Sequence, residues 1–475
     1  MAVLTSTLYV ILLILVIVTL FNIIIFVHEL GHFLAARWRG LQVDRFQIWF
    51  GKPIWKKTIN GVQYGLGWIP AGGFVALPQM APMESIEGAS ADGENRTPLP
   101  PISAMDKITV AFAGPLFSML LALSCAFIVT KVGKPRDFIP ETRIGYVDPE
   151  KPAYKAGIRT GDRILEINGR PVDGFQGSLD SIFEQIVLSR GDQIRFTIER
   201  PGELTPITLE TGFEREQTRW FQRSGLRDVG IDPAGDVLVG YVMQNSPADK
   251  AGIIPGDELI SVDGIELISI AQLSAHMKAR NWQPLEVVVQ SGSNGIRRTL
   301  TLTPETPIKP KDQPPMIGVS WDTSGQVDTR IVHPGAYEQV KDSVRMMWVT
   351  LTSLISPQSS IGVDQLTGPV GIAKIQYQLL QSENGWRRVL AFMVLFNVNL
   401  AILNMLPFPV LDGGHITLAV LEKIAGRPVK AKPLEIVQTA CALALISLML
   451  YVTSKDVGDS FGRSRDGRPN IEFAD

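Results

Sequence analysis

Long apolar stretches and long polar stretches alternate along this chain. Four apolar stretches come close to the roughly 20 residues that an α-helix needs to cross a bilayer, at residues 8–27, 108–132, 389–406 and 434–452. The first lacks a positive amino-terminal flank and is too long for a typical signal peptide, so we expect it to stay uncleaved. The pattern predicts a multi-pass α-helical membrane protein with four transmembrane helices.

Residues 48–78 show a different pattern, in which short β-type runs flank Asn60-Gly61. This dipeptide suits a type I′ turn, so we expect a β-hairpin. Glycines that include Gly72 and Gly73 follow among large apolar residues. Open strand edges persist at membrane depth only when protein buries them or they line a cavity, and the segment is predicted to be a membrane-associated hairpin. A packing role alone is the alternative. Residues 79–103 are polar and are predicted to form a cytoplasmic linker.

An internal repeat occupies the polar region between the second and third apolar stretches. Gly145-Tyr146-Val147 recurs as Gly240-Tyr241-Val242, and Ala156-Gly157-Ile158 recurs as Ala251-Gly252-Ile253, each offset by 95 residues. The repeated A-G-I-x-x-G-D pattern resembles PDZ domains over about 137–212 and 228–305. Such domains bind an extended peptide as an added strand, although a spacer without a ligand is the alternative. We therefore expect two inserted PDZ-like α+β domains.

These patterns predict five parts of the chain. Helices 1 and 2, the hairpin and the linker take residues 1–136, and the PDZ-like domains take 137–227 and 228–310. A connecting segment with an amphipathic helix takes 311–385, and helices 3 and 4 with a tail take 386–475.

Composition agrees with a membrane protein and excludes some partners. Of the 475 residues 45% are hydrophobic, and the net charge of −2 supplies no basic field that would attract nucleic acid. Cys125 and Cys441 lie in apolar stretches, which argues against a disulfide framework and against a cysteine zinc site.

Basic residues predict the orientation of the chain. They follow the first stretch at 37–57 and lie between the third and fourth at 423–432, so both loops are expected in the cytoplasm and both termini outside. Arg387 and Arg388 run against this rule, but the two basic loops agree with each other.

One ionisable motif lies at the end of the first apolar stretch. His28 and His32 are spaced i and i+4, so on a helix both imidazoles can bind one zinc, with Glu29 placed as a general base. Charged groups at membrane depth are costly and mark functional sites. Zinc needs a third protein ligand beside a catalytic water. Asp412 is favoured, and the alternatives are Glu84, Glu87, Glu94 and His415.

Depth in the bilayer favours Asp412. The first and third apolar stretches run in the same direction through the membrane. His28 lies about 20 residues past the start of the first stretch and Asp412 about 20 residues past the start of the third, which is roughly 30 Å along a helix. Pro407 and Pro409 are expected to end the third helix and present the carboxylate from an irregular segment. The amides of Asn399 and Asn404 either hold the substrate backbone or its oxyanion, or bond neighbouring helices.

Together these motifs resemble the site-2 proteases, which are intramembrane zinc metalloproteases, and most closely the bacterial regulator of sigma-E protease group. The resemblance implies zinc on His28, His32 and Asp412, and Glu29 as base. It also implies a substrate site at the hairpin glycines Gly72 and Gly73 and at Asn399, Asn404, Pro407 and Pro409.

The same resemblance implies a place and a substrate. The place is the bacterial inner membrane, with the termini and PDZ-like domains in the periplasm and the active site near the cytoplasmic face. The substrates are transmembrane: an anti-sigma factor already trimmed outside, and signal-peptide remnants, with the PDZ pair as a size filter. Ser118 departs from the family, which usually has Asn there. The rival readings are a non-enzymatic membrane-anchored PDZ scaffold and, more weakly, a zinc transporter.

Overall fold

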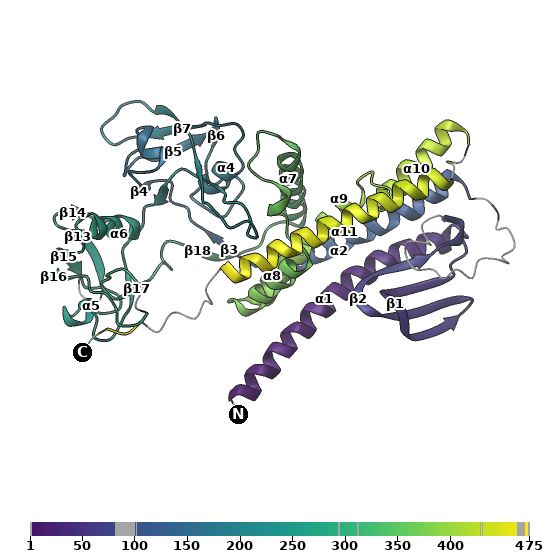
Figure 1. Ribbon diagram of the computed structural model, residues 1–475, viewed down its shortest axis with the longest axis horizontal. Helices are drawn as coiled ribbons and strands as arrows, with labels where there is room; N and C mark the ends of the chain where they lie inside the picture. The colour runs from purple at the N-terminus through teal and green to yellow at the C-terminus, as the bar shows by residue number, and fades with distance from the viewer. Residues whose placement is uncertain are drawn as a thin grey trace. The chain divides into compact units, whose positions relative to one another are not determined.

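The computed structural model describes residues 2–80, 100, 102–292, 295–310, 313–427, 429, 431–462 and 471–473. They form two compact units (Figure 1). One contains Met1–Pro135, Val332–Trp348 and Thr367–Asp456, and the other contains Arg136–Ile331, Val349–Leu366 and Val457–Asp475. Most of the expected linker at 79–103 lies outside the described residues.

The first unit is built on long apolar helices. Among the described residues, four helices are long and apolar enough to cross a membrane, which confirms the predicted spans: α1 (Ala2–Trp38), α2 (Ala104–Val132), α9 (Gly385–Asn404) and α11 (Ala431–Gly462). Leu8, Leu12 and Leu15 are exposed on α1. An exposed leucine row of this kind is typical of a surface that contacts lipid.

Helix α2 is the centre of this unit, because it packs against α1, α9 and α10 (Asp412–Ala425). A capping box begins it, in which Ser103 accepts from the Asp106 N–H and the Asp106 carboxylate accepts from the Ser103 N–H. Where α1 crosses α2, a Cβ on Gly31 would overlap the Ala113 carbonyl. Small residues at a helix crossing let two backbones approach closely, so Gly31 sets the depth at which α1 meets α2.

The predicted hairpin is present, but it folds back on itself. Strands β1 (Arg45–Ile59) and β2 (Val62–Ala76) are joined by Asn60 and Gly61, whose φ angles of 51° and 84° fit a type I′ turn. Residues 45–48 pair with 63–66 on one side and with 73–76 on the other. The ribbon therefore becomes a small sheet whose 73–76 segment continues β2 beside α1.

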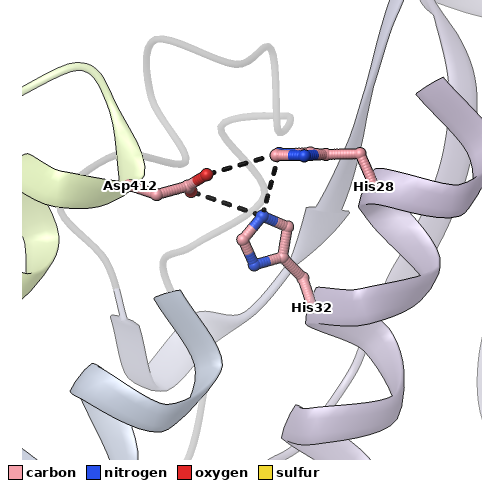
Figure 2. A group of neighbouring side chains, drawn as sticks. All are labelled: His28, His32 and Asp412. Carbon is pink, nitrogen blue, oxygen red and sulfur yellow. Dashed lines mark hydrogen bonds and ion pairs between the residues drawn. The ribbon is translucent and has the colours of Figure 1, made fainter. Parts of the chain in front are cut away.

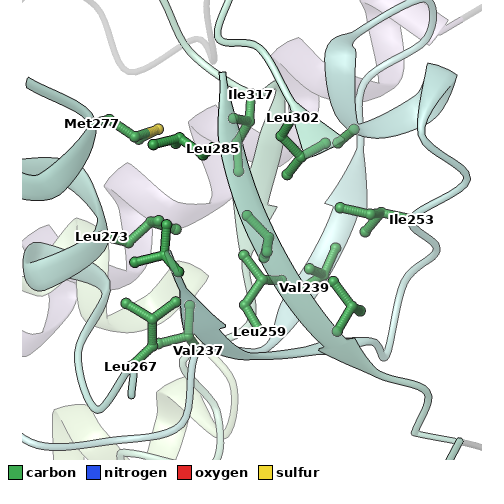
Figure 3. Close-up of a cluster of buried hydrophobic side chains, with 14 residues drawn as sticks. Val237, Val239, Ile253, Leu259, Leu267, Leu273, Met277, Leu285, Leu302 and Ile317 are labelled. Atoms are coloured by element: carbon green, nitrogen blue, oxygen red, sulfur yellow. The ribbon is translucent and has the colours of Figure 1, made fainter. Parts of the chain in front are cut away.

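The second unit contains two small folds of the same design. In each, a four-stranded antiparallel sheet has the same order, β6-β5-β7-β8 in the first and β14-β13-β15-β16 in the second. Each encloses a separate hydrophobic core, and Figure 3 shows the second. The repeated strands are β5 (Arg163–Ile167), β6 (Arg170–Pro171), β7 (Ile194–Glu199) and β8 (Ile207–Thr211), and then β13 (Glu258–Val262), β14 (Ile265–Glu266), β15 (Leu285–Gln290) and β16 (Arg297–Leu302).

Short helices and one extra strand pair complete each fold. The first adds α3 (Pro152–Lys155) and α4 (Ile182–Val187), and the second adds α5 (Pro247–Lys250) and α6 (Ile270–Ala279). Strand β4 (Ile144–Val147) pairs with β11 (Ile231–Pro233), and its counterpart β12 (Val239–Val242) pairs with β17 (Val319–Trp321). Each repeat thus recruits a strand that follows it in the sequence, and β9 (Glu214–Arg215) pairs with β10 (Arg227–Asp228) between them.

The chain enters and leaves the repeat region through neighbouring strands. Strand β3 (Lys134–Phe138) pairs with β18 (Asp328–Val332), and the Thr329 hydroxyl donates to Asp137 Oδ1 at 3.0 Å. After β18, the expected single amphipathic helix is two helices, α7 (Ala336–Ile355) and α8 (Pro369–Gln381). They are separate because Pro357 and Pro369 disfavour helix in the residues before them.

Candidate metal centre

Three donor side chains, two from near the start of the chain and one from near its end, lie together between α1 and α10. His28 and His32 project from successive turns of α1, and Asp412 is the first residue of α10 (Figure 2). The two Nε2 atoms are 3.3 Å apart, His28 Nε2 is 3.3 Å from Asp412 Oδ2, and His32 Nε2 is 3.3 Å from Asp412 Oδ1. These residues therefore form a compact group able to hold a metal ion.

Helix α2 turns both imidazoles toward Asp412. His32 Nδ1 lies 2.8 Å from the Val110 carbonyl, and His28 Nδ1 lies 3.0 Å from the Ser118 hydroxyl. Because a carbonyl only accepts, His32 Nδ1 carries the hydrogen, and a neutral ring then presents a lone pair at Nε2. Outer hydrogen bonds of this kind orient the histidine ligands of metals.

The spacing of the donors fits zinc. Zinc ligands at about 2.0–2.1 Å in a tetrahedron stand roughly 3.3 Å from one another, which is the separation found among the three donors. Gly114 on α2 keeps the adjoining space open, because a Cβ there would overlap the rings of His28 and His32. The residues present therefore fit a zinc ion with an open fourth position.

A cavity of about 320 Å³ adjoins these donors. Glu29 lines it together with Gly72 and Gly73 of the folded hairpin. A Cβ on Gly73 would lie 3.1 Å from Glu29 Cγ and 2.9 Å from Ile25 Cγ2. At Gly73, β2 therefore lies close enough to Glu29 that even a methyl side chain would crowd it.

The predicted asparagines and prolines differ in their distance from the donors. Asn404 lines the cavity, with its Nδ2 3.5 Å from His28 Nε2. Asn399 is not among the lining residues, and in the part of the chain that the structure describes its side-chain oxygen is buried without a hydrogen-bond partner. Pro407 and Pro409 lie in the turn between α9 and α10, of which Val410 and Leu411 reach the cavity.

The alternative third ligands do not join the group. His415 lines the cavity but does not belong to the metal-binding group found among the described residues. Glu84, Glu87 and Glu94 lie outside the described residues.

Tight packing at the start of α10 places Asp412. A Cβ on Gly413 would overlap the Met405 backbone, and one on Gly414 would overlap the Phe408 backbone. The two glycines therefore let the first turn of α10 pack directly on the preceding loop. Further along α10, Glu422 pairs with Lys107 of α2 at 2.7 Å. Burial opposes ionisation of Glu422, but the Lys107 hydrogen bond keeps its pKa below the usual value.

Sequence reasoning missed two groups on α2 that shape this centre. Gly114 stood in the second apolar stretch with no signal beyond the small-residue pair Ala113-Gly114. The Val110 carbonyl has no sequence signature at all, because every residue supplies the same group.

Known proteins share this arrangement of motifs over nearly the whole chain. The sequence pattern of peptidase family M50 matches residues 15–448. The regulator of sigma-E protease RseP of Salmonella typhimurium is 27% identical over 452 residues, covering 90% of this chain and 94% of that protein. Protease RseP of Yersinia pestis is 27% identical, with the same coverage. A Neisseria meningitidis protein named as a zinc metalloprotease is 28% identical, covering 90% of this chain and 95% of its own length.

Proposed function

This chain belongs to peptidase family M50, the site-2 proteases, and is an intramembrane zinc metalloprotease. On that premise we propose that His28, His32 and Asp412 hold the zinc and that Glu29 is the general base. The observation that supports this most is the triangle of donors with 3.3 Å sides, built from two helices that both pack on α2. A membrane-anchored scaffold without activity has no use for such a triangle.

The proposed chemistry divides between metal and protein. A zinc ion held by His28, His32 and Asp412 would lower the pKa of its water toward about 7 and polarise the scissile carbonyl. Glu29 accepts the proton of the attacking water and later delivers it to the leaving amine, so one carboxylate serves as base and then as acid. Asn404, beside His28, donates from its amide to the carbonyl oxygen as negative charge develops on it.

The substrate is proposed to bind as a strand beside the hairpin. A transmembrane helix hides its peptide bonds in its own hydrogen bonds, so it must unwind before hydrolysis. Residues 73–76 pair with 45–48 on one side, and Gly72 and Gly73 line the cavity next to Glu29. Addition of the unwound substrate to this strand would carry its backbone past the base. Pro407 and Pro409 shape the loop before Asp412, whereas Asn399, which does not line the cavity, has no assigned contact with the substrate.

The substrate class and the orientation also belong to this proposal. Substrates are membrane proteins, and we infer single-pass stubs of the anti-sigma-factor type, already cut on their outer side, together with signal-peptide remnants. Two relatives whose names include the words regulator of sigma-E protease support this choice. Both termini and the two PDZ-like repeats are assigned to the periplasm of a bacterial inner membrane, with the active site near the cytoplasmic face and the repeats as a size filter.

Purified variants test the assignments of base and ligand. We expect Glu29→Gln to retain zinc and to cleave a single-helix stub at least about 100-fold more slowly, because proton transfer by a positioned side chain contributes 10²–10⁴-fold. Asp412→Asn should lose zinc, whereas His415→Gln, one turn away, should keep it. Metal is measured by atomic absorption and cleavage by mass spectrometry of the products. Unimpaired cleavage by Glu29→Gln would show that the base is another group.

A further inference from the structure

The short segment that follows α11 packs on the second repeat. Glu472 forms an antiparallel bridge with Lys309: the Glu472 N–H donates to the Lys309 carbonyl at 3.1 Å, and the Ile308 N–H donates to the Glu472 carbonyl at 2.7 Å. The two side chains also form an ion pair at 2.9 Å. The segment is thus held as an added strand.

Phe473 anchors this strand. Its side chain is only 6% exposed. It packs beside Gly318, whose Cβ, if present, would lie 3.0 Å from Phe473 Cε2 and would overlap Ser246. Gly318 also has φ 77°, a backbone conformation that favours glycine. Position 318 beside Phe473 therefore favours glycine for two reasons, the positive φ of its backbone and the lack of room for a Cβ.

Backbone pairing and the aromatic anchor outweigh the ion pair. Lys309 and Glu472 are 66% and 44% exposed, and exposed pairs of this kind contribute little. Burial of an aromatic ring is the larger favourable contribution in such a contact. This part of the second repeat therefore suits an extended segment with a large apolar side chain. The acidic residue before that side chain contributes mainly to the alignment of the two paired strands.

Both arms of one loop meet this segment. Lys309 lies on the arm that leaves the second sheet, and Gly318 lies on the arm that returns to β17. Glu305 and Met316 bridge the two arms, with backbone hydrogen bonds of 2.9 Å and 3.0 Å. The added strand consequently ties the loop to the fold just before β17 begins.

The last turns of α11, which precede this segment, also contact the repeat-containing unit. Asp459 pairs with Arg223, and a Cβ on Gly458 would overlap the Phe221 carbonyl. Both contacts belong to the repeat-containing unit.

We propose that residues 471–473 are a built-in ligand of the second repeat, which binds them through strand pairing with Ile308 and Lys309 and a pocket for Phe473 at Ser246 and Gly318. The occupant is this chain's own segment, and its role is to brace the loop that leads into β17. The brace belongs to a different unit of the chain from the metal donors and needs no protease activity, so it stands or falls independently of the proposed function.

Hydrogen exchange of the full-length protein in detergent tests the brace. In a variant that ends at Gly462, the amides of Ile308 and Lys309 should exchange at least about tenfold faster, because local opening of the loop no longer breaks the bridge to Glu472. Phe473→Ala should give a smaller change in the same direction. Amides of β7 in the first repeat serve as the internal control and should not change. Equal exchange of residues 305–310 in the variant and the parent would overturn the proposal.

A designed disulfide gives a second, independent measurement. Partners that exchange both backbone hydrogen bonds have Cα atoms about 5.5 Å apart, which a disulfide can bridge. Lys309→Cys with Glu472→Cys should therefore oxidise to an intramolecular crosslink, detected by peptide mapping under non-reducing conditions. Each single substitution controls for pairing with the native Cys125 or Cys441. A double variant that stays reduced under conditions that oxidise free dithiols would show that the segment lies elsewhere.

Discussion

Ser118, where the family resemblance leads us to expect Asn, lies beside His28 in the structure. Its hydroxyl lies 3.0 Å from His28 Nδ1 and is completely buried in α2. A hydroxyl can accept the Nδ1 hydrogen and so fix the ring with Nε2 toward the metal. Ser118 therefore supplies a contact that can orient His28.

Replacement of Ser118 should weaken the zinc site without removing a ligand. Loss of an outer partner of a metal-bound histidine typically costs 10–100-fold in metal affinity, so we expect Ser118→Ala to raise the zinc Kd by about that factor. Competition with a chelator measures it. Ser124→Ala is the matched control, because that hydroxyl on the same helix donates only to the Leu120 carbonyl. An unchanged Kd for Ser118→Ala would mean that Ser118 does not orient His28.

At the scale of single residues, the sequence predicts a donor group that the structure brings together, His28, His32 and Asp412. The spacing of His28, Glu29 and His32 needs only one helix, and Asp412 stood out by its depth along the chain. Gly114 and the Val110 carbonyl escaped notice because their roles depend on how closely α1 and α2 approach. That approach is set by tertiary contacts, such as Gly31 against Ala113, which no short motif records.

The folded hairpin is the element that brings a strand backbone close to Glu29. Its turn was predictable, because Asn60-Gly61 has a strong preference for type I′ geometry. The return of residues 73–76 onto 45–48 was not, because a second pairing partner depends on register shifts within a glycine-rich ribbon. The two helices α7 and α8 were likewise merged into one expected helix, although Pro357 and Pro369 mark the break.

We expect that adding one methyl group to the hairpin at Gly73 lowers the cleavage rate but leaves zinc binding unchanged. Gly73→Ala places a Cβ against Ile25 and Glu29, and a small displacement of a reacting group can cost about 10²-fold in rate. We expect slower cleavage with normal zinc content. Gly65→Ala on the same ribbon is the control, since its Cβ meets only ordinary contacts with Trp55 and Gln47. Equal rates for the two variants would remove the argument that the ribbon edge crowds Glu29.

At the scale of the whole molecule, the 95-residue offset between the sequence repeats predicts two copies of one fold. The copies share their sheet order and have separate cores. Strands β11 and β17 were not foreseen, because three residues such as Ile231–Pro233 carry too little pattern to stand out. The pairing of β3 with β18 was also invisible in the sequence, and it shows that the repeats form an insertion whose two connections lie side by side.

This insertion should be removable. We expect that replacing residues 139–327 by a short Gly/Ser linker, with β3 and β18 retained, leaves zinc binding and cleavage of short stubs intact. If the repeats filter by size, the variant should also cut substrates with a long outer domain that the full chain rejects. Cleavage of both substrate lengths is compared by gel. A zinc-loaded variant that cuts neither length would show that the repeats contribute to catalysis itself.

The division of the metal donors between the first and the last third of the polypeptide has a consequence for biosynthesis. While the ribosome is still making the chain, α1 and α2 can already be in the bilayer, but the carboxylate that closes the triangle does not yet exist. At translation rates of 5–20 residues per second, the interval between His32 and Asp412 is on the order of 20–80 s. If Asp412 is a zinc ligand as proposed, a nascent copy would be inert toward neighbouring membrane proteins until α10 has been made and has packed against α2.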